Sequence, residues 1–223
     1  MTRLQLSVGQ ELRLLRELGF EDAYPPGPAQ AAPEGGAGRL ERLQAVAEEA
    51  QGCTACRLCE QRNTVVFGAG DGDADLMFVG EGPGYNEDRQ GLPFVGPAGQ
   101  LLNRIIQAID LRREDVYITN VVKCRPPNNR NPQPDEAAAC RSFLDRQVEL
   151  IAPRVIVALG GVAAQQLLQT RDSVGRLRGR WHDVAGVPVR VTYHPAFLLR
   201  DPSHKRATWE DMQLVRDRLL EAP

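Results

Sequence analysis

The cysteines are the residues whose type and spacing most directly indicate chemistry. Cys53 and Cys56 form a CxxC pair, and Cys124 and Cys140 follow far downstream. Thiolates are soft ligands that select zinc or iron–sulfur clusters over hard cations, and a CxxC spacing lets two sulfurs converge on one centre. The four thiols therefore predict a tetrathiolate metal site. The wide gap between the pairs is unlike a zinc ribbon and predicts a site that ties an early segment to the body of a domain.

Cysteines can also serve as buried core residues or as disulfide partners. Core burial is common for single cysteines such as Cys124 or Cys140, but it explains a CxxC pair poorly. Nothing in the chain resembles a secretory signal, and no apolar run approaches the ~20 residues of a membrane span, so we expect a reducing cytoplasm and no membrane partner. Cys59 is a fifth cysteine, either a spare thiol or a ligand that replaces Cys56.

Composition predicts one globular domain with an appendage. The chain has 223 residues, of which 42% are hydrophobic, and its formal net charge of −2 gives no global attraction to nucleic acid. Charge is nevertheless uneven, because the segment 171–206 holds eight basic residues against three acidic ones. This segment predicts a local phosphate-binding surface, with an arginine-rich solvated surface as the alternative. The basic residues are Arg171, Arg176, Arg178, Arg180, Arg190, Arg200, Lys205 and Arg206.

The first fifty residues differ from the rest. Residues 1–22 contain a short amphipathic segment and predict a helical extension, and residues 23–38 are dense in Pro, Ala and Gly, which predicts a flexible linker. A helix over 39–51 then leads to Cys53, and residues 39–223 form the predicted domain. The extension is a candidate for recruiting a replication or repair protein.

From residue 75 the chain alternates short apolar strands with helices, which predicts a parallel sheet covered on both faces. We expect an α/β fold, a three-layer α/β/α sandwich around a central, mainly parallel four-stranded sheet. Ligands of such sheets bind beyond the carboxyl ends of the strands, so the segments after Val79, around Asn120 and after Tyr193 should converge. The predicted strands are 75–80, 116–122, 154–159 and 187–193, and the predicted helices are 99–109, 135–151, 162–169 and 207–220.

The segment after the first strand is rich in glycine and carries carboxylates. It reads GEGPGYNED over 80–88, and the following 91–97 is framed by glycine and proline, so we expect one continuous loop. A dinucleotide fingerprint would lead directly into a helix, and no Walker lysine is present. After the last strand, His194 stands at the strand mouth, followed by an apolar pair.

These segments together resemble a known family. The motifs are GEGPG with Glu87 and Asp88, GLPFVGPAGQLL (91–102), TNVVKCRPPNNRNP (119–132) and HPAFLLR (194–200), in order and with the cysteines interleaved. From about residue 50 to residue 221 the chain resembles the iron–sulfur uracil-DNA glycosylases, the fourth family of that superfamily, first met in thermophiles. The resemblance implies that uracil is flipped out of single- or double-stranded DNA and cut from its sugar, which leaves an abasic site for base excision repair.

The resemblance implies three roles in the pocket. Phe94 stacks on the flipped uracil, and the amide of Asn120 accepts from uracil N3–H and donates to O4, a pattern that cytosine reverses. His194 donates to uracil O2 as negative charge develops there. Without the resemblance, Phe94 would be a core residue, Asn120 a strand-end residue bonded to a turn, and His194 a cap.

The carboxylates near the pocket leave alternatives open. Glu81 and Gly82 are expected to line it, and the best-known uracil glycosylases carry an aspartate at the position of Gly82. Catalysis then relies on leaving-group stabilisation, or it recruits Glu81 or Glu87 to hold water or the cationic sugar. Glu87 alternatively excludes the methyl group of thymine.

For DNA binding, the resemblance implies that Leu198 and Leu199 fill the gap left by the flipped base and that Arg200 holds phosphate. The alternative is that the two leucines begin the last helix and pack inward. Further candidate DNA contacts flank a cysteine in the third motif. They are Lys123, Arg125 and Arg130.

The resemblance assigns a structural [4Fe–4S] cluster to Cys53, Cys56, Cys124 and Cys140, and zinc fits the same ligands. Two other functions remain: a uracil-DNA binder that traps DNA covalently, and a non-catalytic iron–sulfur DNA-binding accessory module. The covalent class carries a histidine in the loop that here reads RPPNNRNP (125–132), so turnover is favoured. We expect a monomer in the cytoplasm, associated with the nucleoid.

Overall fold

The computed structural model describes residues 36–221. The predicted N-terminal extension (1–22) and most of the predicted linker lie outside the described residues. Helix α2 (Gly36–Gln51) begins at Gly36 rather than at residue 39, so the last residues assigned to the linker belong to its first turn. No helix in the described part of the chain is long and apolar enough to cross a membrane.

The sheet has six strands rather than the predicted four, in the order β1-β3-β2-β4-β6-β5. Its four central strands are parallel and correspond to the predicted ones, whereas both edge strands are antiparallel to their neighbours. The two edge strands were not predicted. β1 has only two residues, and β5 is a partly exposed WHDV segment without apolar alternation. The strands are β1 (Ala69–Gly70), β2 (Leu76–Gly80), β3 (Tyr117–Asn120), β4 (Val155–Leu159), β5 (Trp181–Val184) and β6 (Val187–Thr192).

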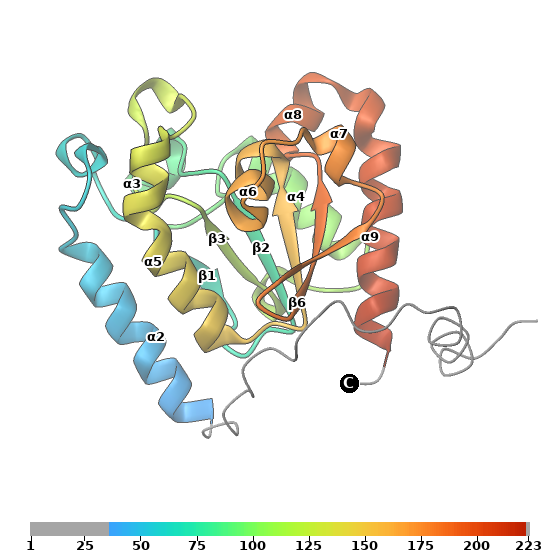
Figure 1. The fold of residues 1–223 in the computed structure, drawn as a ribbon, viewed down its shortest axis with the longest axis horizontal. Helices are drawn as coiled ribbons and strands as arrows, with labels where there is room; N and C mark the ends of the chain where they lie inside the picture. Colours follow the sequence, from blue (N-terminus) through green and yellow to red (C-terminus); the bar gives the residue numbers. More distant parts are fainter. Residues whose placement is uncertain (1–35, 222–223) are drawn as a thin grey trace, which may run out of the picture. The chain divides into compact units, whose positions relative to one another are not determined.

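Helices cover both faces of the sheet. Alternate residues of β2 enter separate cores: Met77 and Val79 face one, and Leu76 and Phe78 face the other. The first core includes apolar residues of α2, α5 and α6, and the second includes those of α4 and α9. Figure 1 shows α2 beside α5 on one side of the sheet and α9 on the other. The predicted three-layer α/β/α class is confirmed, with a larger sheet.

The helices agree with the predicted ones to within a few residues and include additional short elements. The helices of the two layers are α4 (Pro97–Gln107), α5 (Pro134–Ile151), α6 (Gly160–Leu168) and α9 (Lys205–Leu220). The short ones are α3 (Tyr85–Gln90), α7 (Val174–Leu177) and α8 (Pro195–Arg200). Single 3₁₀ turns are η1 (Arg57–Glu60), η2 (Arg113–Asp115), η3 (Pro127–Asn129) and η4 (Pro202–His204).

The prediction of one continuous loop after β2 is wrong, because α3 lies within it. Buried Asp88 anchors this helix by accepting a hydrogen bond from the backbone N–H of Asn63 at 2.9 Å. The helix ends at Gly91, whose φ of 72° lies in the left-handed region that glycine adopts readily. Pro83 precedes the helix and so removes none of its hydrogen bonds.

Candidate active site and cysteine site

A pocket of about 380 Å³ opens at the carboxyl ends of β2 and β3 and at the start of α8. The paired last residues of these strands are Gly80 and Asn120, as the rule for parallel sheets predicts. The pocket brings together most residues singled out from the sequence. They are Glu81, Gly82, Glu87, Phe94, Asn120, His194 and Arg200.

Asn120 carries an unpaired acceptor in the pocket wall. Its side chain is 1% exposed, and among the described residues its Oδ1 has no hydrogen-bond partner. A Cβ at Gly80 would lie 2.3 Å from this Oδ1 and 2.6 Å from the Phe94 ring, so only glycine lets the amide and ring approach. A buried acceptor without a donor is costly and rare in folded proteins. Its position in the pocket wall leaves it available to a donor on a molecule that enters the cavity.

His194 is held as a neutral ring. Its Nδ1 accepts a hydrogen bond from the backbone N–H of Ala196 at 3.1 Å, which leaves the proton on Nε2. Burial lowers the pKa of His194 to about 4, and the nearby charge of Arg200 adds to this shift. The ring therefore offers a neutral N–H donor at the pocket.

Phe94 is both a core residue and a pocket residue. It is 7% exposed, packs in the cluster that contains Phe78 and Leu102, and lines the cavity with its ring centroid 5.6 Å from that of His194. Its φ of 52° is unusual for a bulky side chain. Val95 and Gly96, the two residues after Phe94, donate hydrogen bonds from their backbone N–H groups to Oε1 of Glu87 at 2.8 and 2.9 Å.

Arg113, which the sequence analysis missed, lies on the other side of Phe94. Its guanidinium donates to the carbonyl oxygen of Phe94 at 3.2 Å, to that of Pro93, and to Oδ1 of Asn103 at 2.8 Å. Burial lowers the pKa of Arg113, against the opposing charge of Glu87. An arginine in a turn before a strand carries no sequence signal for this contact.

Glu81 and Gly82 line the same cavity. Burial raises the pKa of Glu81, and within the described residues no hydrogen bond or ion pair engages its carboxylate. A Cβ at Gly82 would lie 2.8 Å from Cγ2 of Val122, so an aspartate would require movement of that valine. Glu81 is thus the pocket carboxylate with both oxygens available.

The two leucines expected at DNA differ in position. Leu199 is 43% exposed on α8, but Leu198 is 1% exposed. The prediction that Leu198 enters DNA is wrong for this conformation, because successive helical residues point in different directions and Leu198 faces inward. Arg200 is exposed and lines the pocket.

Lys123 is buried as well. It is 1% exposed, and its Nζ donates to Oγ1 of Thr119, the carbonyl oxygen of Asn120 and Oε1 of Gln147 at 2.7, 2.7 and 2.6 Å. Burial lowers the pKa of this lysine to about 7. The predicted DNA contact is therefore corrected to an internal brace at the end of β3. Arg130 lines the pocket and pairs with Glu136 at 2.6 Å.

The basic segment 171–206 is only partly a surface feature. Arg190 is 3% exposed and bonds to buried Asp211 at 2.7 Å, and Arg178 bonds to the same carboxylate at 3.0 Å. These two arginines neutralise an internal charge. The predicted phosphate-binding surface thus loses Arg190, while Arg200 stays available at the pocket mouth.

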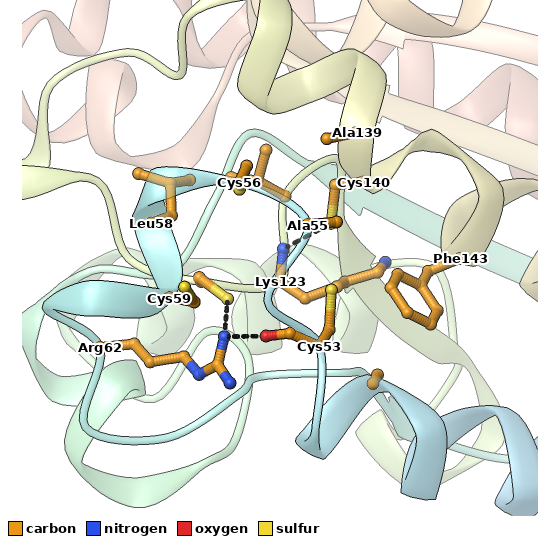
Figure 2. A pocket seen from close by; sticks show the side chains of 13 residues that line it. Cys53, Ala55, Cys56, Leu58, Cys59, Arg62, Lys123, Ala139, Cys140 and Phe143 are labelled. Carbon is orange, nitrogen blue, oxygen red and sulfur yellow. Dashed lines mark hydrogen bonds between the residues drawn. The ribbon is translucent and has the colours of Figure 1, made fainter.

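A second pocket gathers all five cysteines (Figure 2). Cys53, Cys56 and Cys59 come from the segment after α2, Cys124 follows β3, and Cys140 lies in α5. None of the five, all of which lie in the described residues, forms a disulfide. The structure thus brings the four predicted ligands together and ties the early segment to the sheet domain, with Cys59 as a fifth neighbour.

Hydrogen-bond donors point at two of the sulfurs. Arg62, a residue that the sequence analysis missed, donates from Nη1 to Sγ of Cys124 at 3.4 Å, and the backbone N–H of Lys123 donates to Sγ of Cys140 at 3.3 Å. Burial raises the pKa of Cys124 to about 11, although Arg62 acts in the opposite direction. Burial also raises the pKa values of Cys56 and Cys140. Donors to sulfur in an apolar setting suit thiolates that bind a metal centre.

Fold and pocket together define a class: a three-layer α/β protein that presents an aromatic wall, a buried amide and a neutral imidazole at the carboxyl edge of its sheet. Such a pocket suits a flat, hydrogen-bonding ring such as a nucleobase. Residues 67–213 match the family model of the Uracil DNA glycosylase superfamily. The chain belongs to this superfamily.

Curated relatives agree with this membership. The chain is 48% identical over 182 residues to the type-4 uracil-DNA glycosylase of Thermotoga maritima, covering 80% of this chain and 95% of the relative. Identity is 42% to the type-4 enzyme of Saccharolobus solfataricus, with 82% and 89% covered, and 43% to that of Archaeoglobus fulgidus, with 79% and 92% covered. The family predicted from the motifs is confirmed.

Proposed function

We propose that the protein is a monofunctional uracil-DNA glycosylase, which hydrolyses the bond between N1 of uracil and C1′ of deoxyribose. Water adds at C1′ and gives up a proton, uracil leaves with the bonding electrons and takes up a proton from solvent, and an abasic site remains for base excision repair. The observation that carries the proposal is the buried, unpaired Oδ1 of Asn120 in a base-sized pocket. The names of the type-4 relatives support it.

Asn120 selects the base. Its Oδ1 accepts from uracil N3–H, and its amide nitrogen donates to O4. Cytosine presents an acceptor at N3 and a donor at C4, so it leaves the buried oxygen unpaired. Phe94 supplies a stacking surface that has no base preference of its own.

His194 stabilises the leaving group. Its Nδ1 is occupied by Ala196 N–H, so Nε2–H is the donor for uracil O2. The bond strengthens as negative charge develops on the uracil ring, which lowers the barrier more than it lowers the energy of the bound substrate. A neutral imidazole does this without a proton transfer.

Glu81 holds the attacking water or the cationic sugar. Its carboxylate has no partner among the described residues, whereas Oε1 of Glu87 already accepts two backbone hydrogen bonds. The role of Glu87 is therefore to fix the loop that carries Phe94 and to occupy space beside the base. No carboxylate stands at Gly82, so leaving-group stabilisation carries more of the catalysis.

DNA is held at the mouth of the pocket. Arg200 binds phosphate, and exposed Leu199 enters the stack that the flipped base vacates. Substrates are uracil-containing single strands and duplexes.

Cys53, Cys56, Cys124 and Cys140 would hold a structural [4Fe–4S] cluster, and zinc is the alternative for the same ligands. The four thiols come from three separate segments and line one cavity, so the bound group would brace the chain. Excision itself needs no electron transfer.

We extend this proposal to oligomeric state, location and partners. The protein acts as a monomer in the cytoplasm, close to the nucleoid. Its N-terminal extension, residues 1–22, recruits a replication or repair protein. Size measurement in solution and capture of partners with and without residues 1–35 test these two parts.

An end-labelled oligonucleotide with one uracil opposite guanine tests the central proposal. Cluster-loaded protein is expected to produce strand cleavage only after hot alkali and only at uracil, with thymine and cytosine oligonucleotides as controls. A stable protein–DNA adduct without cleavage would indicate the covalent binder instead. Binding without either product would indicate the accessory module.

A further inference from the structure

Phe94 adopts a backbone conformation that bulky residues avoid. Its φ is 52°, in the left-handed region, where the side chain crowds its own backbone. Such a conformation persists only where the surroundings over-determine it. The ring that it directs into the pocket is the proposed stacking surface for uracil.

Two side chains fix the peptide groups on either side of this residue. Arg113 donates to the carbonyl oxygens of Pro93 and Phe94, and Glu87 accepts from the backbone N–H groups of Val95 and Gly96. A guanidinium is a rigid, permanently charged fork that can bridge neighbouring carbonyls, which a lysine ammonium cannot reproduce in the same geometry. The two contacts together form a clamp around one residue.

The clamp is itself anchored. Arg113 is half-buried and also donates to Oδ1 of Asn103 in α4 at 2.8 Å. The same helix closes on Phe94 from the other side, because a Cβ at Gly99 would lie 1.8 Å from the Phe94 carbonyl oxygen. The Phe94 carbonyl is thus confined between α4 and Arg113. The hydrogen bond from Arg113 therefore fixes the orientation of this peptide group.

We propose that Arg113 is a positioning residue for uracil excision, acting with Glu87 to hold Phe94 so that its ring is in place before the base arrives. This inference rests on the proposed function and on the stacking role of Phe94. A Phe94 ring that is already in place contributes its full stacking energy to uracil binding, because the side chain loses no conformational freedom when uracil binds. Arg113 does not line the pocket itself.

The test compares Arg113→Met and Arg113→Lys with a matched control, Arg112→Met. Arg112 is the exposed neighbour and pairs with Asp115 and Glu114. The measurements are the single-turnover excision rate, inhibition by free uracil, affinity for abasic duplex and the thermal midpoint. Arg113→Met should weaken uracil inhibition and slow excision by about tenfold, within the range of one aromatic–base stack. Arg113→Lys should give an intermediate excision rate and intermediate uracil inhibition. The control Arg112→Met should match the wild type, and the affinities for abasic duplex should be unchanged in all variants.

A double mutant shows whether the arginine acts through the ring. In a Phe94→Leu background, Arg113→Met should add almost no further loss of uracil inhibition. Additive losses, or an equal loss of abasic-duplex affinity, would overturn the positioning role. Should Arg113→Met fail to fold, Arg113→Lys in the same background gives the comparison.

The failure of this inference differs from the failure of the proposed function. A wild type that excises uracil no faster than Arg113→Met overturns the positioning role alone. A wild type that excises no uracil overturns the proposed function and this inference with it.

Discussion

The base-sized pocket and the cysteine site both form where β3 ends, but they treat their polar groups differently. The pocket leaves Asn120 Oδ1 without a partner among the described residues, whereas donors from Arg62 and Lys123 already point at Cys124 and Cys140 in the cysteine site. An unpaired acceptor fits a ligand that arrives and leaves. Sulfurs with preset donors fit a centre that stays.

Lys123 connects the two regions. Its backbone N–H donates to Sγ of Cys140, and its Nζ donates to the carbonyl oxygen of Asn120. Damage at the cysteine site should therefore reach the pocket through the end of β3, whereas damage in the pocket should leave the cysteine site intact. The predictions below test this asymmetry.

The largest effect is expected in the pocket, from His194→Leu. Loss of the Nε2–H donor should lower the single-turnover excision rate by about 10²–10³-fold, as removal of one preset donor to a developing anion does. Iron content should stay at the wild-type level. His204→Leu, outside the pocket, is the control, and a loss below about tenfold would contradict the role given to His194.

The cysteine site is broken by Cys124→Ser. Bound iron and stability should fall together, with the thermal midpoint lower by about 10 °C, which is about 3–5 kcal/mol for a chain of this size. Excision should fall with the folded fraction. Iron analysis and thermal unfolding measure both, with Cys59→Ser as the control that keeps iron. Loss of iron with an unchanged midpoint would contradict a structural role.

Glu81→Gln should change the pH dependence of excision. Burial raises the pKa of Glu81, so its carboxylate is lost as pH falls through that raised value, and activity falls with it. The pKa of His194 is about 4, so its protonation begins only at lower pH. The variant should lose about 10²-fold at neutral pH and show no acidic decline until the pH at which His194 is protonated. Glu114→Gln is the surface control. An acidic decline of the excision rate that persists in Glu81→Gln would rule out Glu81 as its source.

The smallest effect is expected from Leu199→Ala at the proposed DNA-binding surface. Excision from duplex DNA should slow by about threefold to tenfold, since one apolar side chain supports the flipped state. Single-stranded substrate should be affected less, because no stack closes behind the base. Leu214→Ala is the control, since Leu199 and Leu214 are both 43% exposed. Equal losses on both substrates would contradict the wedge role.

Sequence predicted the parts of the fold that depend on local pattern. Strands β2 and β4 are apolar runs, and β3 and β6 are rich in β-branched and aromatic residues, so local pattern indicates all four. Two-residue β1 forms only by pairing with distant β3, and β5 is a short segment without apolar alternation that pairs with the adjacent β6 across residues 185–186. Helix α3 was missed because its glycine- and proline-rich surroundings indicate a loop, and its anchor, Asn63 on Asp88, is distant in sequence.

In the site, Phe94, Asn120, His194 and the cysteines stand in recognisable motifs. Arg62 and Arg113 do not, because their contacts arise where separate segments meet in space. Leu198 and Lys123 lie inside motifs, yet their direction depends on packing that spacing does not reveal.

The most direct test of the account compares uracil with 3-deazauracil, which lacks N3–H, in wild-type protein and in Asn120→Leu, by single-turnover excision. If Asn120 Oδ1 receives N3–H, the wild type should lose rate on 3-deazauracil, and the variant should be nearly indifferent to the change, so that the two losses do not add. Fully additive losses would show that the orphaned oxygen does not receive N3–H, and would contradict the assignment of this pocket to uracil.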